Sequence, residues 1–336
     1  MPDIARVGPT TARILVVDLL GGLGDLVMVL PVIHALHRRH PDAQLRVLTH
    51  QPGDVLLQHD PAVAAVVLAE RGRERAAVLA ELDRWRPDLV VTTTRYDGIA
   101  DAIEELAPQS VTNLWRSPPA DEPVSARYLR ILASEHVIDA HDVGLVPHVV
   151  LTDAERVEGE QVLGDEGRPV VLVPATGMAV KQWPHWRQLA TALAGRALVA
   201  GEPEVLHAWR GGPARLLPPL PLRGLAAVFA AVGRRGGVVV GGDTGPMRLA
   251  AAVGARTVGI FGPTVADRYG LGPPGVDLQG LPDCPHRRPT AITEQVCWWE
   301  AHCPLSSDGP ACMADVTPDR VLELLPVSVV RQGVSC

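Results

Sequence analysis

Apolar runs and helically spaced apolar residues alternate along the chain. In the first half, apolar runs rich in β-branched residues predict strands over residues 13–20, 43–50, 63–69 and 89–95. The segments between them show helical spacing, clearest over residues 26–40 and 74–88, where Pro87 marks the helix end. Strands that alternate with helices in this way predict a parallel, doubly wound sheet.

The same alternation restarts after residue 150. A helix over residues 153–164, with Asp153 as its expected N-cap, opens the second series. The pattern then predicts strands over residues 169–176, 196–203, 236–243 and 256–263, and helices over residues 183–195, 225–235 and 244–255. We therefore expect an α/β chain of two Rossmann-like domains, residues 1–150 and 151–336, facing a central cleft.

Charged residues lie where such a fold binds its ligands. Ligands of doubly wound sheets bind at the carboxyl ends of the strands. Four charged residues lie just past predicted strand ends: Asp25, Lys181, Glu202 and Asp243. They are the first candidates for site residues.

Length and charge narrow the class of protein. The 336 residues suffice for two domains, and the net charge of −7 with no basic run argues against a nucleic-acid or anionic-membrane partner. Residues 1–150 carry 14 Arg and 20 Asp+Glu, a net charge of −6, so the first half is the acidic one. The chain start does not resemble a signal peptide, and no apolar run approaches the ~20 residues of a membrane span. We expect a cytoplasmic protein with no transmembrane segment.

All five cysteines lie beyond residue 280: Cys284, Cys297, Cys303, Cys312 and Cys336. In a cytoplasmic protein a set of structural disulfides is not expected. The spacing contains no CxxC pair and, even with His286 and His302 nearby, matches no standard zinc motif. Buried or loop thiols are therefore favoured over a bound metal.

The glycine-rich loop GGLGDL (21–26) raises the possibility of a dinucleotide site. Gly22 and Gly24 match the first two glycines of the fingerprint, but Val27 stands where the third belongs, and the next strand ends without a carboxylate for the ribose. A nicotinamide cofactor is thus disfavoured. The loop does supply Asp25 at a helix N-terminus, either as an ordinary first-turn acid or as a general base at the floor of the cleft.

One basic residue differs in kind from all the others. Of the 31 Lys+Arg in the chain, only Lys181 is a lysine. A compact ammonium suits a role as a point charge, and chance retention at a solvated position is the alternative.

The stretch GGDTGPM (241–247) predicts a strand, a tight loop and a helix start. Asp243 or Thr244 can cap this helix. The free amides of Thr244, Gly245 and Met247 then suit phosphate binding, and a capped helix without a ligand is the alternative.

Together these segments resemble the successive motifs of the bacterial heptosyltransferase family, glycosyltransferase family 9. The matching stretches are ILVVDLLGGLGDLVMVLPVIHALHRRHPDAQLRVLT, VVLVPATGMAVKQWPHWRQLATAL, LVAGEPE and GVVVGGDTGPMRLAAAVGARTVGIFGPT, in the family's order over roughly residues 13–265. The cysteine-containing tail resembles the C-terminal region of many members. The resemblance implies the two-domain GT-B fold and inverting transfer of heptose from an ADP-sugar without a catalytic metal.

The resemblance also implies roles for individual residues. Asp25 matches the acid of the LGD motif, thought to be the catalytic base, and Lys181 matches a lysine that contacts the donor phosphates. The other residues expected to bind the donor are Thr176 beside the phosphates, Glu202 or Glu204 near the ribose, and Asp243, Thr244, Gly245, Met247 and Arg248 around the sugar and diphosphate.

Two positions depart from the family pattern. Members commonly have His after DTGPM, and here Arg248 adds a fixed charge to a donor contact. Many lipopolysaccharide members carry a basic residue after the fourth strand for an acidic acceptor, and here that place is Gly98. We expect Gly24 and Arg95 on the acceptor side, with Arg95 as a candidate replacement for the missing basic residue.

The sequence thus predicts an inverting, metal-independent glycosyltransferase that uses an ADP-heptose-like donor. The acidic first half favours an amine-bearing natural product, such as an aminocyclitol or aminonucleoside, as the hydroxyl acceptor. A lipopolysaccharide core heptosyltransferase is the alternative, followed by a nicotinamide-dependent oxidoreductase and a non-catalytic binding protein. Four tryptophans are expected to serve core or hinge packing rather than to stack on adenine or sugar: Trp183, Trp186, Trp298 and Trp299.

Overall fold

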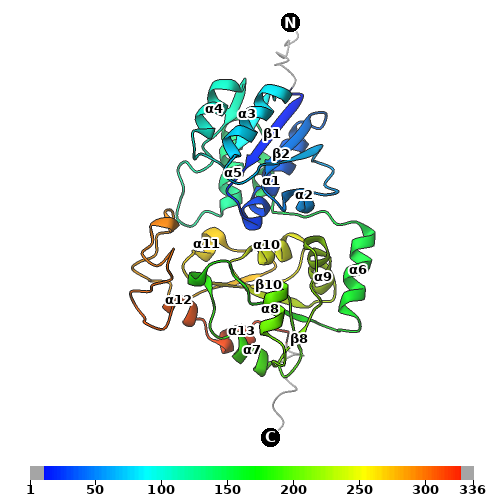
Figure 1. Cartoon of the computed structure of the whole chain (residues 1–336), viewed down its shortest axis with the longest axis vertical. Helices are drawn as coiled ribbons and strands as arrows, with labels where there is room; N and C mark the ends of the chain where they lie inside the picture. Colours follow the sequence, from blue (N-terminus) through cyan, green and yellow to red (C-terminus); the bar gives the residue numbers. More distant parts are fainter. Residues whose placement is uncertain (1–10, 327–336) are drawn as a thin grey trace. The chain divides into compact units, whose positions relative to one another are not determined.

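The chain, described here over residues 11–326 of a computed structural model, divides into two compact units (Figure 1). Unit 1 holds the described residues up to Ser117 together with Ser125–Val146. Unit 2 holds Pro118–Val124 and the described residues from Pro147 onward. The division lies close to the expected boundary at residue 150, but the assignment of Pro118–Val124 to unit 2 is a feature that the sequence pattern does not indicate.

Unit 1 is built on a parallel sheet with the strand order β3–β2–β1–β4–β5. Its strands are β1 (Arg13–Asp18), β2 (Gln44–Thr49), β3 (Ala65–Leu68), β4 (Leu89–Thr92) and β5 (Gln109–Val111). Its helices are α1 (Leu23–Arg39), α2 (Gly53–Leu56), α3 (Glu74–Trp85), α4 (Ile99–Leu106), α5 (Val124–Ser134) and the 3-10 turn η1 (Ala140–Gly144). The strand order reverses between β1 and β4, so their carboxyl ends form the point where ligands of such sheets bind.

Unit 2 repeats this plan with the strand order β11–β10–β9–β6–β7–β8, again with all pairs parallel. Its strands are β6 (Val170–Val173), β7 (Ala197–Val199), β8 (Arg215–Leu216), β9 (Val238–Gly242), β10 (Thr257–Phe261) and β11 (Val276–Gln279). Its helices are α6 (Asp153–Leu163), η2 (Ala179–Lys181), α7 (Trp186–Ala192), α8 (Pro203–Ala208), α9 (Leu222–Arg234), α10 (Gly245–Ala252), α11 (Ala266–Tyr269), η3 (Ile292–Glu294), α12 (Ala311–Ala314) and α13 (Pro318–Leu322). The predicted α/β class with two parallel sheets is confirmed. Within residues 11–326, no helix combines the length and the apolar character that crossing a bilayer requires.

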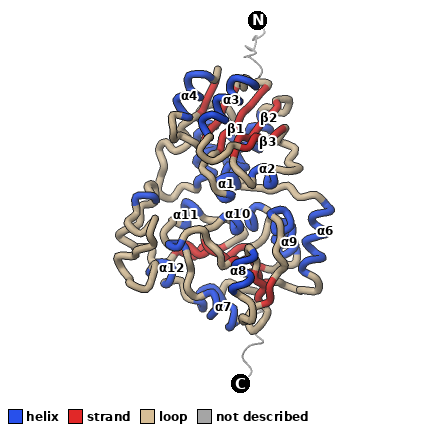
Figure 2. The backbone as a smooth tube through the Cα atoms, viewed as in Figure 1, coloured by secondary structure: helices blue, strands red, loops and turns tan. Residues whose placement is uncertain are grey.

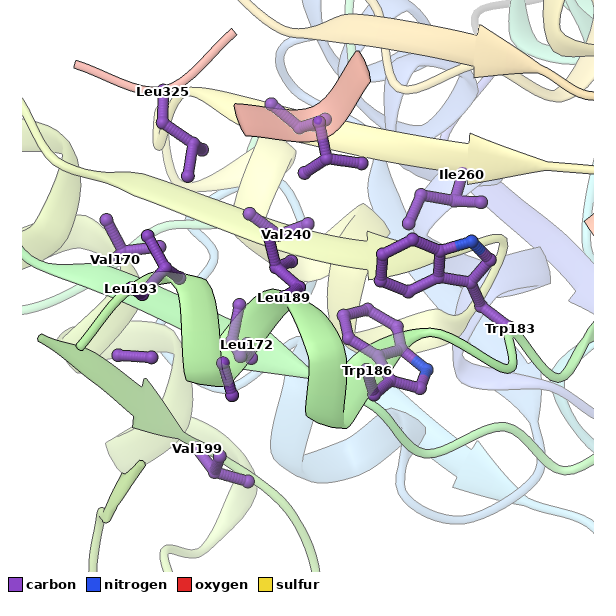
Figure 3. Packing of buried hydrophobic residues seen from close by; sticks show 14 of the residues in the cluster. Val170, Leu172, Trp183, Trp186, Leu189, Leu193, Val199, Val240, Ile260 and Leu325 are labelled. Carbon is purple, nitrogen blue, oxygen red and sulfur yellow. The ribbon is translucent and has the colours of Figure 1, made fainter. Parts of the chain in front are cut away.

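The core of unit 2 lies between its sheet and α7. Figure 2 shows α7 on one side of the strands and α10 on the other. Trp183 and Trp186 pack edge to face with ring centroids 4.8 Å apart, and Figure 3 shows the Trp183 ring toward the sheet residue Ile260 and the Trp186 ring against Trp183. The buried indole of Trp183 donates a hydrogen bond to the carbonyl of Val316 at 2.8 Å. The packing role expected for these two tryptophans is therefore confirmed.

The contact between α6 and α9 depends on a helix cap and a glycine. The N-cap of α6 is Thr152 and not Asp153, because the Thr152 hydroxyl accepts from the Glu155 amide at 3.2 Å while the Glu155 carboxylate accepts from the Thr152 amide at 2.7 Å. One turn later Gly159 lies so close to α9 that an added Cβ would be 2.2 Å from the carbonyl oxygen of Ala227. The absence of a side chain at residue 159 thus sets the distance between these helices.

We predict that Gly159→Ala destabilises the protein by about 1–3 kcal/mol, because α6 must move away from α9 to admit the methyl group. Chemical denaturation measures the change in the free energy of unfolding. Gly167→Ala is the matched control, since an added Cβ there meets no atom within 4 Å. Equal stability of the two variants would contradict the close helix contact.

Candidate active site

A buried carboxylate links the ends of neighbouring strands in unit 2. Asp243 follows β9, and its Oδ2 lies 2.7 Å from Nζ of Lys181, which follows β6. Oδ2 also accepts a hydrogen bond from the hydroxyl of Thr264, after β10, at 3.0 Å. Because β6, β9 and β10 are neighbours in the sheet, their carboxyl ends bring these residues together. Sequence reasoning identified Lys181 and Asp243 but missed Thr264, whose only signal was a polar residue just past a strand.

Neighbouring charges keep Asp243 ionised. Burial acts to raise its pKa, but the positive charges of Arg248 and Lys181, with the hydrogen bonds from Lys181 and Thr264, outweigh burial and hold the pKa of Asp243 below its ordinary value. One carboxylate is therefore shared by two cations.

Arg248 turns inward from α10. Its Nη2 lies 2.7 Å from Oδ1 of Asp243 and donates to the carbonyl of Tyr269 at 2.8 Å. The side chain is buried, so these two partners fix the guanidinium. A direct contact of Arg248 with the donor stays a prediction, and the observed bonds show that Arg248 holds Asp243 in place.

The start of α10 is not capped by its own side chains. Thr244 occupies the N-cap position with extended backbone angles, but its hydroxyl makes no cap hydrogen bond. Asp243, the other expected cap, directs its carboxylate to Lys181 and Arg248 instead. The side chain of Met247 is fully buried, which leaves only its backbone amide as a possible ligand contact. The first-turn amides of Gly245 and Met247 therefore have no side-chain cap from either residue, so α10 begins in the form that suits an anion.

The remaining expected donor residues follow adjacent strands. Thr176 lies between β6 and Lys181, and its hydroxyl accepts from the amide of Met178 at 3.2 Å. Glu202 is the N-cap residue of α8, after β7, and Glu204 lies in the first turn of that helix. Both carboxylates are exposed at the carboxyl end of the sheet, and the structure does not distinguish between them.

In unit 1, two carboxylates lie near the end of β1. Asp25 is the third residue of α1 and half-buried, and its Oδ2 would be 2.8 Å from a Cβ added to Gly22. Asp18, the last residue of β1, is buried and accepts from the hydroxyl of Thr93 at 2.6 Å. Burial raises the pKa of Asp18 to about 7, the Thr93 hydrogen bond opposes this rise, and the charge of Asp25 adds to it. Sequence reasoning missed Asp18, although an acid at the end of an apolar strand is a visible signal.

The expected acceptor residues also lie at the carboxyl end of the unit 1 sheet. Gly24 is the second residue of α1, between two residues that line a small pocket formed by residues 21–23, 26 and 49–53. Arg95 follows β4 and is exposed. Gly98 is the N-cap of α4 with φ of 65°, a left-handed conformation that strains any residue with a Cβ. A basic side chain at this position would therefore be strained.

Four cysteines line a single pocket in unit 2: Cys284, Cys297, Cys303 and Cys312. Burial raises the pKa of Cys312 to about 12 and also raises the pKa of Cys297, so both thiols are protonated at neutral pH. Within the described part of the chain, no three of these sulfurs lie within 4.8 Å of one another, whereas tetrahedral coordination with metal–sulfur bonds of about 2.3 Å needs closer sulfurs. The preference for loop thiols over a bound metal stays a prediction.

A different group has metal-ligand spacing. Ligand atoms of Asp139, His141 and Asp142 lie within 4.8 Å of one another in unit 1. Arg38 already lies 3.1 Å from Asp142 and Arg39 lies 3.5 Å from Asp139, so each of these carboxylates is already paired with an arginine side chain. Of the other tail residues, His286 lines the cysteine pocket, His302 is exposed, and Cys336 lies outside the described residues.

We predict that Asp18→Asn changes how stability depends on pH. Because the pKa of Asp18 is raised from 3.8 to about 7, the folded protein keeps a proton that the unfolded chain releases between these values. Stability therefore falls as pH rises through this window, by up to about 1.4 kcal/mol for each pH unit. The asparagine can still accept from Thr93 but cannot titrate, so its stability relative to wild type should rise with pH across the window. Urea unfolding over this range measures the difference, and parallel curves for the two proteins would contradict a raised pKa.

Comparison with known proteins bears on the family and the fold of this chain. The model of glycosyltransferase family 9 (heptosyltransferase) matches residues 104–279. Lipopolysaccharide heptosyltransferase 1 of Pseudomonas aeruginosa is 28% identical, over 92% of this chain and 96% of that protein. A glycosyl transferase family 9 structure from Veillonella parvula has a TM-score of 0.73 and 14% identity, covering 95% of this chain and 97% of that one. ADP-heptose lipopolysaccharide heptosyltransferase II of E. coli has a TM-score of 0.68 and 20% identity, covering 96% of this chain and all of that one.

The solved structures confirm the expected GT-B fold class. The family model spans more than half of the chain and includes β6 to β10, together with the strand ends that carry Lys181 and Asp243. This chain accordingly belongs to glycosyltransferase family 9, a family of heptosyltransferase enzymes.

Proposed function

We propose that this enzyme transfers a heptose-type sugar from an ADP-sugar to a hydroxyl acceptor. The observation that carries the proposal is the Lys181–Asp243 pair beside the uncapped start of α10. A diphosphate needs a cation and several N–H donors in one place, and this edge of the unit 2 sheet supplies both. The E. coli relative described as an ADP-heptose heptosyltransferase supports the choice of donor.

The donor-side residues act on the leaving group. As the bond from the anomeric carbon to the diphosphate breaks, negative charge develops on ADP. Lys181 and the first-turn amides of α10 stabilise this charge, so we propose that no catalytic metal is required. Arg248 contributes through Asp243, whose position it fixes. We further propose that Thr176 contacts the phosphates and that Glu202 or Glu204 binds the ribose.

Asp25 is the proposed general base. It removes the proton from the acceptor hydroxyl as that oxygen attacks the anomeric carbon on the face opposite the diphosphate. One carbon–oxygen bond forms while one breaks, the proton passes to Asp25, and ADP departs. A single displacement of this kind inverts the anomeric centre.

For the acceptor, we propose an amine-bearing natural product. The carboxylate of Asp25 in the first turn of α1, the net charge of −6 over residues 1–150 and the side-chain-free position at Gly98 favour a cationic molecule over an acidic one. The 28% identity to a lipopolysaccharide heptosyltransferase favours the alternative, an acidic core-sugar acceptor. The negative charge of residues 1–150 would attract a cationic acceptor and repel an acidic one, and this difference provides a test.

We predict that Asp25→Asn lowers kcat by roughly 10²–10⁴ and leaves the affinity for ADP nearly unchanged. The amide keeps the size of the side chain but cannot take the proton. Release of ADP during turnover measures kcat, and calorimetric titration measures ADP binding. Near-normal turnover of the variant would contradict the general-base role, and a wild-type protein that binds ADP-heptose but never releases ADP with any acceptor would instead be a binding protein.

We predict that kcat/KM for an aminocyclitol acceptor falls as ionic strength rises, because salt screens attraction between the amine and the acidic unit. The N-acetylated form of the same aminocyclitol is the matched control, and its kcat/KM should be lower at low salt and less dependent on salt. Efficient transfer to an acidic lipid A-linked acceptor, with none to any amino-sugar tested, would assign the enzyme to lipopolysaccharide synthesis instead.

Two further measurements test the remaining parts of the proposal. Full activity in the presence of a chelator would support metal independence, and NMR of the product anomer would test inversion.

A further inference from the structure

Trp298 contacts Lys181, the one lysine of the chain. The centroid of the Trp298 ring lies 5.3 Å from Nζ of Lys181, within the range of a cation–π contact. The indole is buried, at 6% exposure, although its neighbour Trp299 is 74% exposed. Trp298 therefore has a specific partner in addition to a place in the packing.

An aromatic face suits this place better than a second acid would. Lys181 already lies 2.7 Å from Oδ2 of Asp243, and Arg248 takes the other oxygen of the same carboxylate. A further acid beside Lys181 would cancel the charge that a diphosphate must meet, whereas the ring of Trp298 attracts the ammonium without neutralising it.

Trp298 belongs to a segment that is tied to the same edge of the sheet. We call residues 281–312, which contain the four described cysteines, the cysteine-bearing segment. Its Arg287 is buried and donates to the carbonyl of Gly262 at 2.7 Å and to that of Gly280 at 2.7 Å. Gly262 lies just after β10, two residues before Thr264, which donates to Asp243.

The backbone around Trp298 is held as well. The amide of Trp298 donates to the carbonyl of Gln295 at 3.0 Å, and the buried amide side chain of Gln295 donates to the carbonyl of Ile292 at 3.0 Å. The loop that presents the indole is thus built by its own hydrogen bonds and anchored by Arg287. These hydrogen bonds fix the position of the Trp298 indole relative to Lys181.

We propose that Trp298 is a positioning residue, which acts through Lys181 to hold the ammonium where the donor diphosphate binds. The cysteine-bearing segment is then part of the donor site, although it lies far along the chain from the glycosyltransferase motifs. This inference rests on the proposed function, because it takes Lys181 as the partner of the diphosphate.

The test compares Trp298→Leu, which removes the aromatic face, with Trp298→Phe, which keeps one. Trp298→Leu should weaken ADP binding by about three- to thirtyfold, as expected for loss of a desolvated cation–π contact. Trp298→Phe should retain most of the affinity. The dissociation constant for ADP is measured by calorimetry, and kcat and KM for ADP-heptose are measured on the same samples. Thermal melts confirm that each variant is folded, and Trp298→Phe keeps the test decisive if the leucine variant does not fold.

A matched control exists in the same unit. Trp209 is also 6% exposed and also lies beside a cation, but its cation–π partner is Arg187, whose Cζ lies 5.2 Å from the ring centroid, and not Lys181. Trp209→Leu should lower the melting temperature without changing the affinity for ADP. Equal loss of ADP affinity in the Trp209 and Trp298 variants would show that Trp298 serves packing alone and would overturn the inference.

A double-mutant cycle with Lys181→Ala separates this inference from the proposed function. If Trp298 acts through Lys181, Trp298→Leu should have little further effect on ADP affinity once Lys181 is alanine. Independent, additive losses would overturn the positioning role while leaving Lys181 as a phosphate contact. Unchanged ADP affinity in Lys181→Ala alone would instead refute the proposed donor site, and the inference with it.

Discussion

The burial of the Asp243 carboxylate is the constraint on which the carboxyl edge of the unit 2 sheet depends. An ionised carboxylate that is removed from water must be paired with positive charge and hydrogen-bond donors. Lys181, Arg248 and Thr264 meet that need from three different segments of the chain. Asp243 directs its carboxylate to these partners and not to α10, and the hydroxyl of Thr244, the N-cap residue, makes no cap hydrogen bond either, so the helix start is left uncapped.

Each unit buries an acidic side chain at the carboxyl end of its sheet, but the pKa of that side chain shifts in opposite directions in the two units. Asp243 lies between two cations, and its pKa falls below the ordinary value. Asp18 lies at the equivalent end of the unit 1 sheet but is held by the neutral hydroxyl of Thr93, and burial raises its pKa to about 7. One fold plan, used twice in a chain, thus carries a permanently charged group in one copy and a protonatable group in the other.

The sequence was sufficient to predict the long, buried strands and the candidate site residues just past their ends. Continuous apolar runs correctly predicted β1, β2, β6, β9 and β10. The edge strands β5, β8 and β11 escaped notice because they are only 3, 2 and 4 residues long and are not fully buried, so no periodicity can develop. Asp153 was wrong as the N-cap of α6: Asp is the stronger cap by residue type, but the spacing of Thr152 and Glu155 is that of a capping box, a signal in the sequence that was overlooked.

Contacts between distant segments were beyond sequence reasoning for a different reason. Lys181 and Asp243 were found together because each follows a strand of a known fold plan, which fixes their neighbourhood. Trp298 follows no strand, and nothing in its local sequence separates it from Trp299, yet one indole lies beside Lys181 and the other is exposed. Burial decides between them, and burial is a property of the folded chain.

The left-handed backbone at Gly98 adds a cost to any basic side chain at the start of α4. A lysine or arginine there would adopt a φ of 65°, which strains a residue that has a Cβ. Arg86 has a φ of 50° in the same unit, so the fold already bears this strain at one arginine. A basic residue at position 98 would therefore either keep this conformation at a cost in stability or shift the loop between β4 and α4.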